Sequence, residues 1–439
     1  MAAALARLSH HAITIGSAIV SRTAVYLVLI AAARLLEPAD FSVFAVSLTV
    51  IGIIAGVISG GDMWLNRFTR AELTLRSTLP IWRAYMGAAL RTALIAGLVV
   101  IGFGLLFFDP GPEHRMMVFY SALGGMLAGL AECLFGMVRA SGRVNAFFAL
   151  RDLIMPLGIL ALIALIRPHM SDHAMLIHIG VWAVGLATAA WLVQRGTGLF
   201  TVRPQGNGLL RKRIAGHHLA LALSNLSSRL AAYCDILALA WYAPIVFVGE
   251  YRVAAQFAIG FWIVQHFIFL GLPWQVRRLT RDDGGAGSAV VLGRQRLLLL
   301  LALGGLVVVG LLAAPILSLF GERFVDSAHL FQLLLLLRFT DLLWGPQHEL
   351  MVSNRLARED AWANGLALVT WPTIFVACVT TGNPIGAALS AGVASAIASR
   401  LYRHSVIRRA GLDPHFGHPL GLSLPLGLGA ATVALAWLV

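Results

Sequence analysis

Long apolar blocks alternate along the chain with short breaks that are rich in charged, proline and glycine residues. Each block has about 20 residues, which is the length that a helix needs to cross a hydrocarbon core of ~30 Å. The breaks divide the chain into thirteen predicted membrane-spanning helices: 12–33, 42–61, 86–108, 117–138, 147–166, 174–194, 218–241, 250–271, 297–320, 328–350, 361–381, 384–402 and 419–439. The pattern therefore predicts an all-α, polytopic membrane protein.

The composition agrees with this pattern and excludes the soluble classes of protein. Hydrophobic residues make up 59% and charged residues 12% of the chain, with a mean hydropathy of +0.82, whereas soluble domains have about 25% charged residues. The net charge is +13, which in a soluble protein would indicate nucleic acid as a partner. In a membrane protein the same charge reports which side of the membrane each loop occupies, so no nucleic-acid partner is expected.

The distribution of basic residues predicts the orientation of the chain. If the N-terminus is cytoplasmic, 24 of the 33 Lys and Arg residues fall in cytoplasmic segments, four in outer segments and five within spans. Cytoplasmic loops of membrane proteins carry an excess of Lys and Arg. We therefore expect a multi-pass protein of a bacterial inner (plasma) membrane, surrounded by membrane lipids, with its N-terminus in the cytoplasm.

A short internal repeat relates the two halves of the chain. Residues 21–26 and 228–233 share Ser, Arg, Ala and Tyr at an offset of 207, and each copy precedes a proline turn and an aromatic start to the next helix. Six predicted helices separate the copies, so both have the same orientation, as in parallel repeats. The repeat predicts two parallel six-helix bundles around a central cavity. The expected divisions are an N-terminal bundle (1–194), a basic cytoplasmic linker (195–217), a C-terminal bundle (218–402), and a cytoplasmic segment with an additional C-terminal helix (403–439).

The residues of both copies carry a family resemblance. The first copy contains Gly16-Ser17, Ser21-Arg22, Ala33-Arg34-Leu35-Leu36, Pro38 and the aromatic-rich 41–45, and the second contains Asp235, the apolar 236–241, Gly249-Glu250-Tyr251-Arg252 and Pro273 with a basic tail to Arg281. In this order they resemble the Wzx-like polysaccharide (O-antigen) flippases of the multidrug/oligosaccharidyl-lipid/polysaccharide (MOP) exporter superfamily. The chain departs from the family pattern at Ile236, where a basic residue is usual, and at Glu37, where a turn glycine is usual. Its thirteen predicted helices also differ from the usual twelve or fourteen.

The resemblance implies a flippase that moves a lipid-linked (undecaprenyl-pyrophosphate) oligosaccharide from the cytoplasmic to the outer leaflet by alternating access. Such a protein serves lipopolysaccharide or exopolysaccharide biosynthesis, with a polysaccharide polymerase and glycosyltransferases as expected partners. Two alternatives stay open: a multidrug or cation antiporter of the same superfamily, and a non-transporting membrane scaffold of a polysaccharide assembly complex. Because the sequence has no phosphate-binding Gly-Lys-Ser/Thr loop and no other enzyme motif, neither an enzymatic activity nor a cofactor is expected.

Charged residues within predicted spans are the candidate functional residues, since an arginine at the bilayer centre costs about 2.5–3.5 kcal/mol on insertion scales. Arg22 and Arg229 occupy equivalent positions in the repeat, and Arg338 lies within a later span. A guanidinium group can bind phosphate oxygens with two hydrogen bonds, so these three are candidates for binding the pyrophosphate in a cavity. For Arg22 and Arg229, reaching out of the membrane to the headgroups is an equally good interpretation.

The acidic residues within spans are candidates for ion coupling or charge pairing. Asp341 follows Arg338 by three residues, so the two share a helix face and are expected to form an ion pair. Asp235 and, more weakly, Glu132 are candidates for cation or proton coupling or for holding an arginine. Arg252 is expected to reach the headgroups and His266 to be a packed neutral side chain. Two glycine series at four-residue spacing, Gly52/Gly56/Gly60 and Gly125/Gly129, predict close helix packing.

Overall fold

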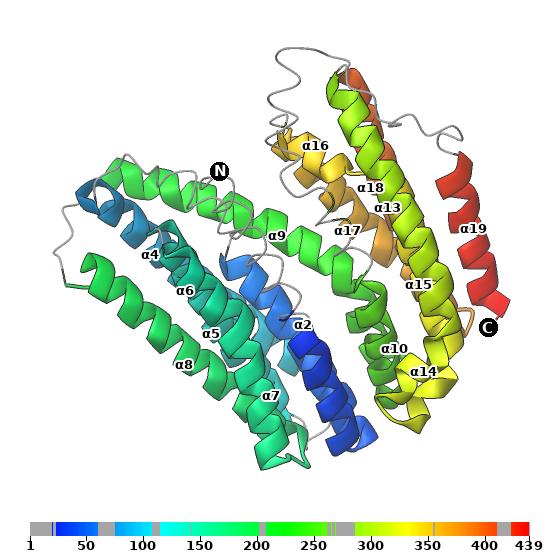
Figure 1. Ribbon diagram of the computed structural model, residues 1–439, viewed down its shortest axis with the longest axis horizontal. Helices are drawn as coiled ribbons and strands as arrows, with labels where there is room; N and C mark the ends of the chain where they lie inside the picture. Colours follow the sequence, from blue (N-terminus) through cyan, green and yellow to red (C-terminus); the bar gives the residue numbers. More distant parts are fainter. Residues whose placement is uncertain are drawn as a thin grey trace, which may run out of the picture. The chain divides into compact units, whose positions relative to one another are not determined.

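The computed structural model describes residues 20, 23–59, 75–107, 115–141, 143–201, 208–260, 265, 268, 286–353, 356–410 and 423–438 (Figure 1). All regular secondary structure in these residues is helical. Eight of their helices are long and apolar enough to cross a membrane, and two shorter apolar helices, Thr23–Leu35 and Ser423–Leu438, add to them. The prediction of an all-α, multi-pass membrane protein is confirmed.

Where the structure describes them, the predicted spans coincide with helices. In the first half these are Thr23–Leu35, α2 (Pro38–Ser59), α4 (Leu75–Phe107), α5 (Arg115–Ala140), α6 (Val144–Phe148), the π-helix η2 (Ala149–Ile154), α7 (Met155–Ile166) and α8 (Ser171–Thr197). They continue with α9 (Gly208–Tyr242), α10 (Ile245–Ala258), α13 (Ala286–Leu311), α14 (Ala313–Ser318), the 3-10 helix η3 (Glu322–Ser327), α15 (Ala328–Leu343), α16 (Gln347–Ser353), α17 (Ala357–Val379), α18 (Pro384–Arg409) and α19 (Ser423–Leu438). Several spans that we expected as single helices are divided into two or three consecutive elements.

The chain forms two compact units, 1–229 and 230–439, and α9 contributes residues to both. Because α9 begins at Gly208, residues 208–217 of the segment expected as a linker are helical. The reason is local packing, since Ile214 of this segment is buried in the hydrophobic core of the N-terminal unit.

In the N-terminal unit, α5 packs closely against α2 through glycine. A Cβ atom added at Gly125 would lie 2.6 Å from Cβ of Ile54, and one added at Gly129 would lie 2.6 Å from Cβ of Ile58. The close packing predicted for Gly125 and Gly129 is confirmed, because no larger side chain fits at this helix distance. The other glycine series behaves differently. Gly56 packs against Arg229 of α9, no described atom lies within 4 Å of a Cβ at Gly52, and Gly60 lies outside the described residues.

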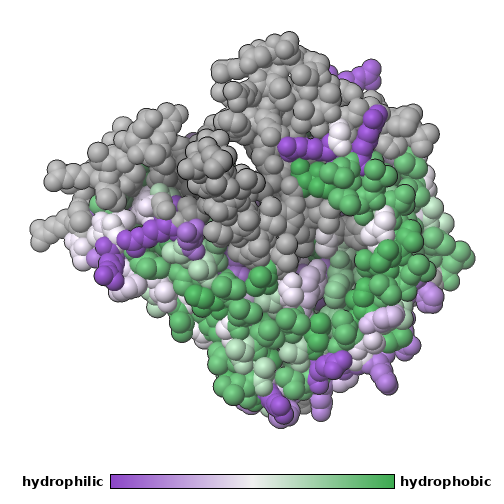
Figure 2. Space-filling view, viewed as in Figure 1, coloured by the Kyte–Doolittle hydropathy of each residue, from purple (hydrophilic) through white to green (hydrophobic). Residues whose placement is uncertain are grey.

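The surface of the helices is suited to lipid. Large apolar side chains are exposed along α4 and α13, including Leu98, Leu106, Leu300 and Leu311. Figure 2 shows broad apolar areas on the face in view. This distribution is the one that a helix bundle in a bilayer requires.

The core of the C-terminal unit is built on the pairing of α17 with α18. Small residues of α18, among them Gly386 and Ala391, face its neighbours. The C-terminal helix α19 packs against α18, where the indole Nε1 of Trp437 donates a hydrogen bond to Ser390 Oγ at 3.0 Å. Residues 403–409, which follow the predicted span 384–402, form the last turns of α18. This extension of the helix is important for the site, because Arg403 lies in it and is buried within the unit.

Candidate functional site

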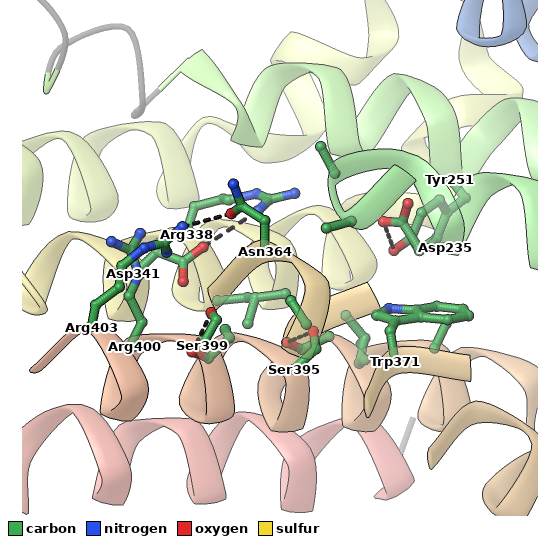
Figure 3. A pocket seen from close by; sticks show the side chains of 18 residues that line it. Asp235, Tyr251, Arg338, Asp341, Asn364, Trp371, Ser395, Ser399, Arg400 and Arg403 are labelled. Atoms are coloured by element: carbon green, nitrogen blue, oxygen red, sulfur yellow. Dashed lines mark hydrogen bonds and ion pairs between the residues drawn. The ribbon is translucent and has the colours of Figure 1, made fainter. Parts of the chain in front are cut away.

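A pocket of about 180 Å³ lies within the C-terminal unit between α9, α10, α15, α17 and α18 (Figure 3). Its polar lining residues are Asp235, Tyr251, Arg338, Asp341, Asn364, Ser395, Ser399, Arg400 and Arg403. Figure 3 shows the arginines with Asp341 and Asn364 toward one end, and Asp235, Tyr251 and Trp371 toward the other. The pocket is therefore polar along its length but cationic at only one end, which we call the arginine end (Arg338, Arg400 and Arg403).

Arg338 and Asp341 pair at the arginine end, as their spacing on one helix predicted. Nη1 of Arg338 lies 3.4 Å from Oδ2 of Asp341, and one helical turn separates the two residues on α15. Nε of Arg338 is buried without a hydrogen bond. The guanidinium group thus makes fewer hydrogen bonds with the described residues than it can donate, which leaves it able to bind an anion from the pocket.

Arg403 is held by two side chains of α17. Its Nε donates to Oδ1 of Asp360 at 2.8 Å and its Nη2 donates to Oδ1 of Asn364 at 2.6 Å. The remaining nitrogen, Nη1, makes no hydrogen bond to the described residues. Arg403 is only 7% exposed, yet it lines the pocket. Its orientation is therefore fixed by Asp360 and Asn364 while one donor group stays available to a ligand.

A carboxylate and an aromatic pair mark the other end of the pocket. The hydroxyl of Tyr251 donates to Oδ2 of Asp235 at 2.8 Å, and the backbone N–H of Ile236 donates to Oδ1 at 2.8 Å. Trp371 lines the pocket there and stacks on Phe375 with ring centroids 4.9 Å apart. Asp235 is thus bonded by a tyrosine and by its own helix, and no ion pair of Asp235 occurs in the described part of the chain.

Of the other predicted site residues, one falls outside the described part of the chain and two lie in the N-terminal unit. Arg22 lies outside the described residues, as does His266. Arg229 is exposed, and its side chain covers Gly56 of α2 so closely that a Cβ there would lie 2.9 Å from the arginine Nε. Glu132 forms an ion pair with Arg151 of η2, with a shortest distance of 2.8 Å. Glu132 therefore joins α5 to η2 inside its own unit.

The expectation for Arg252 was wrong. The side chain is 7% exposed, and its guanidinium carbon lies 5.5 Å from the ring centroid of Tyr233. A cation over an aromatic face is stabilised electrostatically, and this contact inside the unit replaces the expected reach to the headgroups.

The sequence analysis missed Arg400, Arg403, Asp360 and Asn364 as site residues. The predicted span ends at residue 402, so Arg403 was placed in the cytoplasmic segment that follows, and Arg400, close to the end of the span, was counted with it. A polar stripe at four-residue spacing, Ser395, Ser399 and Arg403, was the signal that could have found them, because such residues share a helix face. As for metal sites, no group of His, Cys, Asp and Glu in the described residues could hold a metal ion.

Comparisons with known proteins identify the fold. No protein-family model and no curated sequence matches the chain. A solved structure of a multidrug resistance MATE family transporter of the MOP superfamily, facing inward, matches with a TM-score of 0.64 and 14% identity, over 89% of this chain and 96% of that one. The protein has the MOP-superfamily fold. The lipid II flippase MurJ in an inward closed conformation matches with a TM-score of 0.66 and 12% identity, over 98% of this chain and 92% of that one. A MATE protein in a bent conformation matches with a TM-score of 0.52 and 13% identity, over 90% of this chain and 94% of that one.

These MOP-fold structures agree with the superfamily that the sequence resembled. Their identities of 12–14% mean that the agreement concerns the fold. The choice among substrates therefore depends on the residues of the pocket.

Proposed function

We propose that the protein is a flippase that moves a lipid-linked oligosaccharide across the membrane by alternating access, with the pyrophosphate of the lipid bound at the arginine end of the pocket. The observation that carries this proposal is the arginine end itself, where Arg338, Arg400 and Arg403 line one cavity within a membrane protein. The lipid II flippase MurJ, which has the same fold, supports it.

The chemistry of a pyrophosphate fits the arginine end. Each phosphate shares its negative charge between two terminal oxygens, which the guanidinium fork binds with paired hydrogen bonds. Moving such an anion through a region of low dielectric constant is expensive unless cations compensate it. The arginines supply that compensation, and Arg22 and Arg229 remain predicted contacts of the pyrophosphate. With no nucleotide-binding loop in the sequence, an ion gradient or the membrane potential drives the movement.

A multidrug or cation antiporter is the second candidate, favoured by Asp235, Asp341 and Trp371 in the same pocket. Carboxylates attract organic cations, and an aromatic face stabilises them. Drug-resistance profiling of a deletion strain separates the two functions, because only the antiporter alters sensitivity to cationic drugs.

The direct test is a flipping assay with the purified protein in liposomes. We expect transfer of a fluorescent polyprenyl-pyrophosphoryl oligosaccharide, reduced about ten-fold or more in Arg338→Gln and Arg403→Gln. Each variant loses charge-assisted hydrogen bonds to phosphate, which are worth about 1.5–3 kcal/mol. Arg296→Gln on the exposed face of α13, outside the pocket, is the matched control and should flip normally.

Two outcomes would count against the proposal. Undiminished transfer by the Arg338→Gln/Arg403→Gln double variant would contradict the assignment of the pyrophosphate site to the arginine end. The flippase function would be contradicted if the intact protein transferred no lipid and a deletion strain without a redundant homologue kept normal surface polysaccharide. Loss of polysaccharide without transfer by the purified protein would instead favour a scaffold.

A further inference from the structure

His348 connects the arginine end of the pocket to the outside of the unit. It belongs to α16, and its Nδ1 lies 2.8 Å from Oδ2 of Asp360. The same carboxylate binds Nε of Arg403 through its other oxygen, Oδ1, at 2.8 Å. The His348 side chain is 55% exposed, whereas that of Asp360 is 5% exposed. One buried carboxylate is therefore shared between an imidazole that water can reach and a guanidinium that lines the pocket.

Two described helices bring further charged groups to the surroundings of His348. The helix α16 packs against α17 and α18. The titratable and charged residues that these two helices bring to this end of the unit are Arg358, Glu359 and Asp360 from α17 and Arg400, Arg403 and His404 from α18. Of the six, Asp360 is hydrogen-bonded to His348. His404 is 8% exposed, so His348 is the histidine of this cluster that most readily exchanges a proton with solvent.

We infer that protonation of His348 is linked to anion binding at the arginine end, with Asp360 as the connecting group. The inference rests on the proposed function, because it assumes that the pocket binds a phosphate-class anion. When the imidazole is neutral, Asp360 cancels the charge of Arg403 and the three groups have no net charge. When the imidazole is protonated, the three groups carry one net positive charge beside the pocket.

The sign of the linkage follows from this charge count. An anion binds more tightly when His348 is protonated, so its affinity falls as the pH rises through the range in which an imidazole loses its charge, about pH 5 to 8. Linkage is reciprocal, so binding of the anion takes up a proton. His348 thus adjusts capture of the pyrophosphate to the pH of the compartment that it faces, and Asp360 is a positioning residue for Arg403.

The test measures binding of a soluble, short-chain polyprenyl-pyrophosphoryl sugar to the purified full-length protein in detergent. This probe is suitable because each phosphate is linked through one ester and the anhydride oxygen, so each keeps a single negative charge over the pH range used. We expect affinity to be about five-fold or more higher near pH 5.5 than near pH 8, and this dependence to be absent in His348→Gln. His329→Gln is the matched control. It makes the same change at an exposed histidine of α15, nine residues or about 14 Å along the helix from Arg338, and should keep the dependence of the intact protein.

A second measurement needs no variant. Calorimetric titration of the intact protein in two buffers with different ionisation enthalpies should show net proton uptake on binding near neutral pH. Inorganic pyrophosphate in place of the lipid probe shows whether the phosphates alone are recognised. Tighter binding of the lipid form identifies the lipid as the ligand, and equal binding identifies the phosphate group.

Failure of the inference differs from failure of the proposed function. Binding by the intact protein with the same pH dependence in His348→Gln, or binding without proton uptake, would overturn the inference alone. No binding at either pH would overturn the proposed function and the inference with it.

Discussion

At the residue scale, the pair formed by Asp360 and Arg403 is the feature most open to a stability test. Both side chains are buried, and they form an ion pair with Nε of Arg403 2.8 Å from Oδ1 of Asp360. Asp360→Ala leaves a buried guanidinium without its carboxylate, which costs about 3–5 kcal/mol in comparable buried pairs. We expect a clear loss of thermal stability of the detergent-solubilised protein. Arg358→Ala, an exposed charge on the same helix, should have little effect.

A double variant completes this test. Replacing both members, in Asp360→Ala/Arg403→Met, removes the uncompensated charge and should recover part of the stability that Asp360→Ala loses. A double variant no more stable than the single one would show that the loss comes from packing around Asp360. This would contradict the assignment of Asp360 as the charge partner of Arg403.

The residues of the site differ in how far the sequence could predict them. Arg338 and Asp341 were predicted as a pair because three residues on one helix fix their distance. Arg403 and Asp360 are 43 residues apart, so their contact depends on how α17 packs on α18. Hydrophobic periodicity along a single chain does not contain that information. Arg252 shows the same limit, since the ring of Tyr233 that covers it belongs to another helix.

At the element scale, the contact between α5 and α2 predicts that a single methyl group is destabilising. In Gly129→Ala the new Cβ would lie 2.6 Å from Cβ of Ile58, so the helices must separate. Overpacking of this kind costs about 1–3 kcal/mol. It should outweigh the gain of about 1 kcal/mol expected from the better helix former, and thermal unfolding measures the sum.

The control is Gly180→Ala on α8. Gly180 is exposed, and no described atom lies within 4 Å of its added Cβ, so this variant should be as stable as the parent or slightly more stable. If Gly129→Ala were as stable as Gly180→Ala, the close packing of α5 against α2 at Gly129 would be contradicted.

The elements themselves were largely predictable, because a span must be apolar over the thickness of the bilayer whatever it packs against. The ends of the helices were not. The helices α9 and α18 continue beyond their apolar blocks, since residues at these ends are buried by neighbouring helices. Ile214 in one extension and Arg403 in the other are held by such packing. The boundaries therefore depend on tertiary contacts, and the sequence pattern underestimated both helices.

At the scale of the whole molecule, the sequence repeat corresponds to a structural feature shared by the two halves. In the first, the helix Thr23–Leu35 ends two residues before α2 begins at Pro38. In the second, α9 ends at Tyr242 and α10 begins at Ile245 after Pro244. Proline restrains the backbone just where one helix stops and the next starts. The matching pair of helices supports duplication as the origin of the fold, which the repeated residues predicted.

The orientation of the molecule in the membrane is the last prediction, and it depends on the excess of Lys and Arg in alternate loops. Of the 33 basic residues, 24 lie in segments that we place in the cytoplasm and four in outer segments, a bias that sets orientation during insertion.

In a background lacking Cys133, Cys234 and Cys378, single cysteines are introduced as Phe200→Cys, after α8, and Thr381→Cys, between α17 and α18. Both positions are exposed. A membrane-impermeant maleimide should label 381 in intact cells and label 200 only after permeabilisation. Labelling of position 200 in intact cells would show that the orientation is the opposite of the predicted one. Because His348 lies on the same predicted side as position 200, it would then face the outside of the cell.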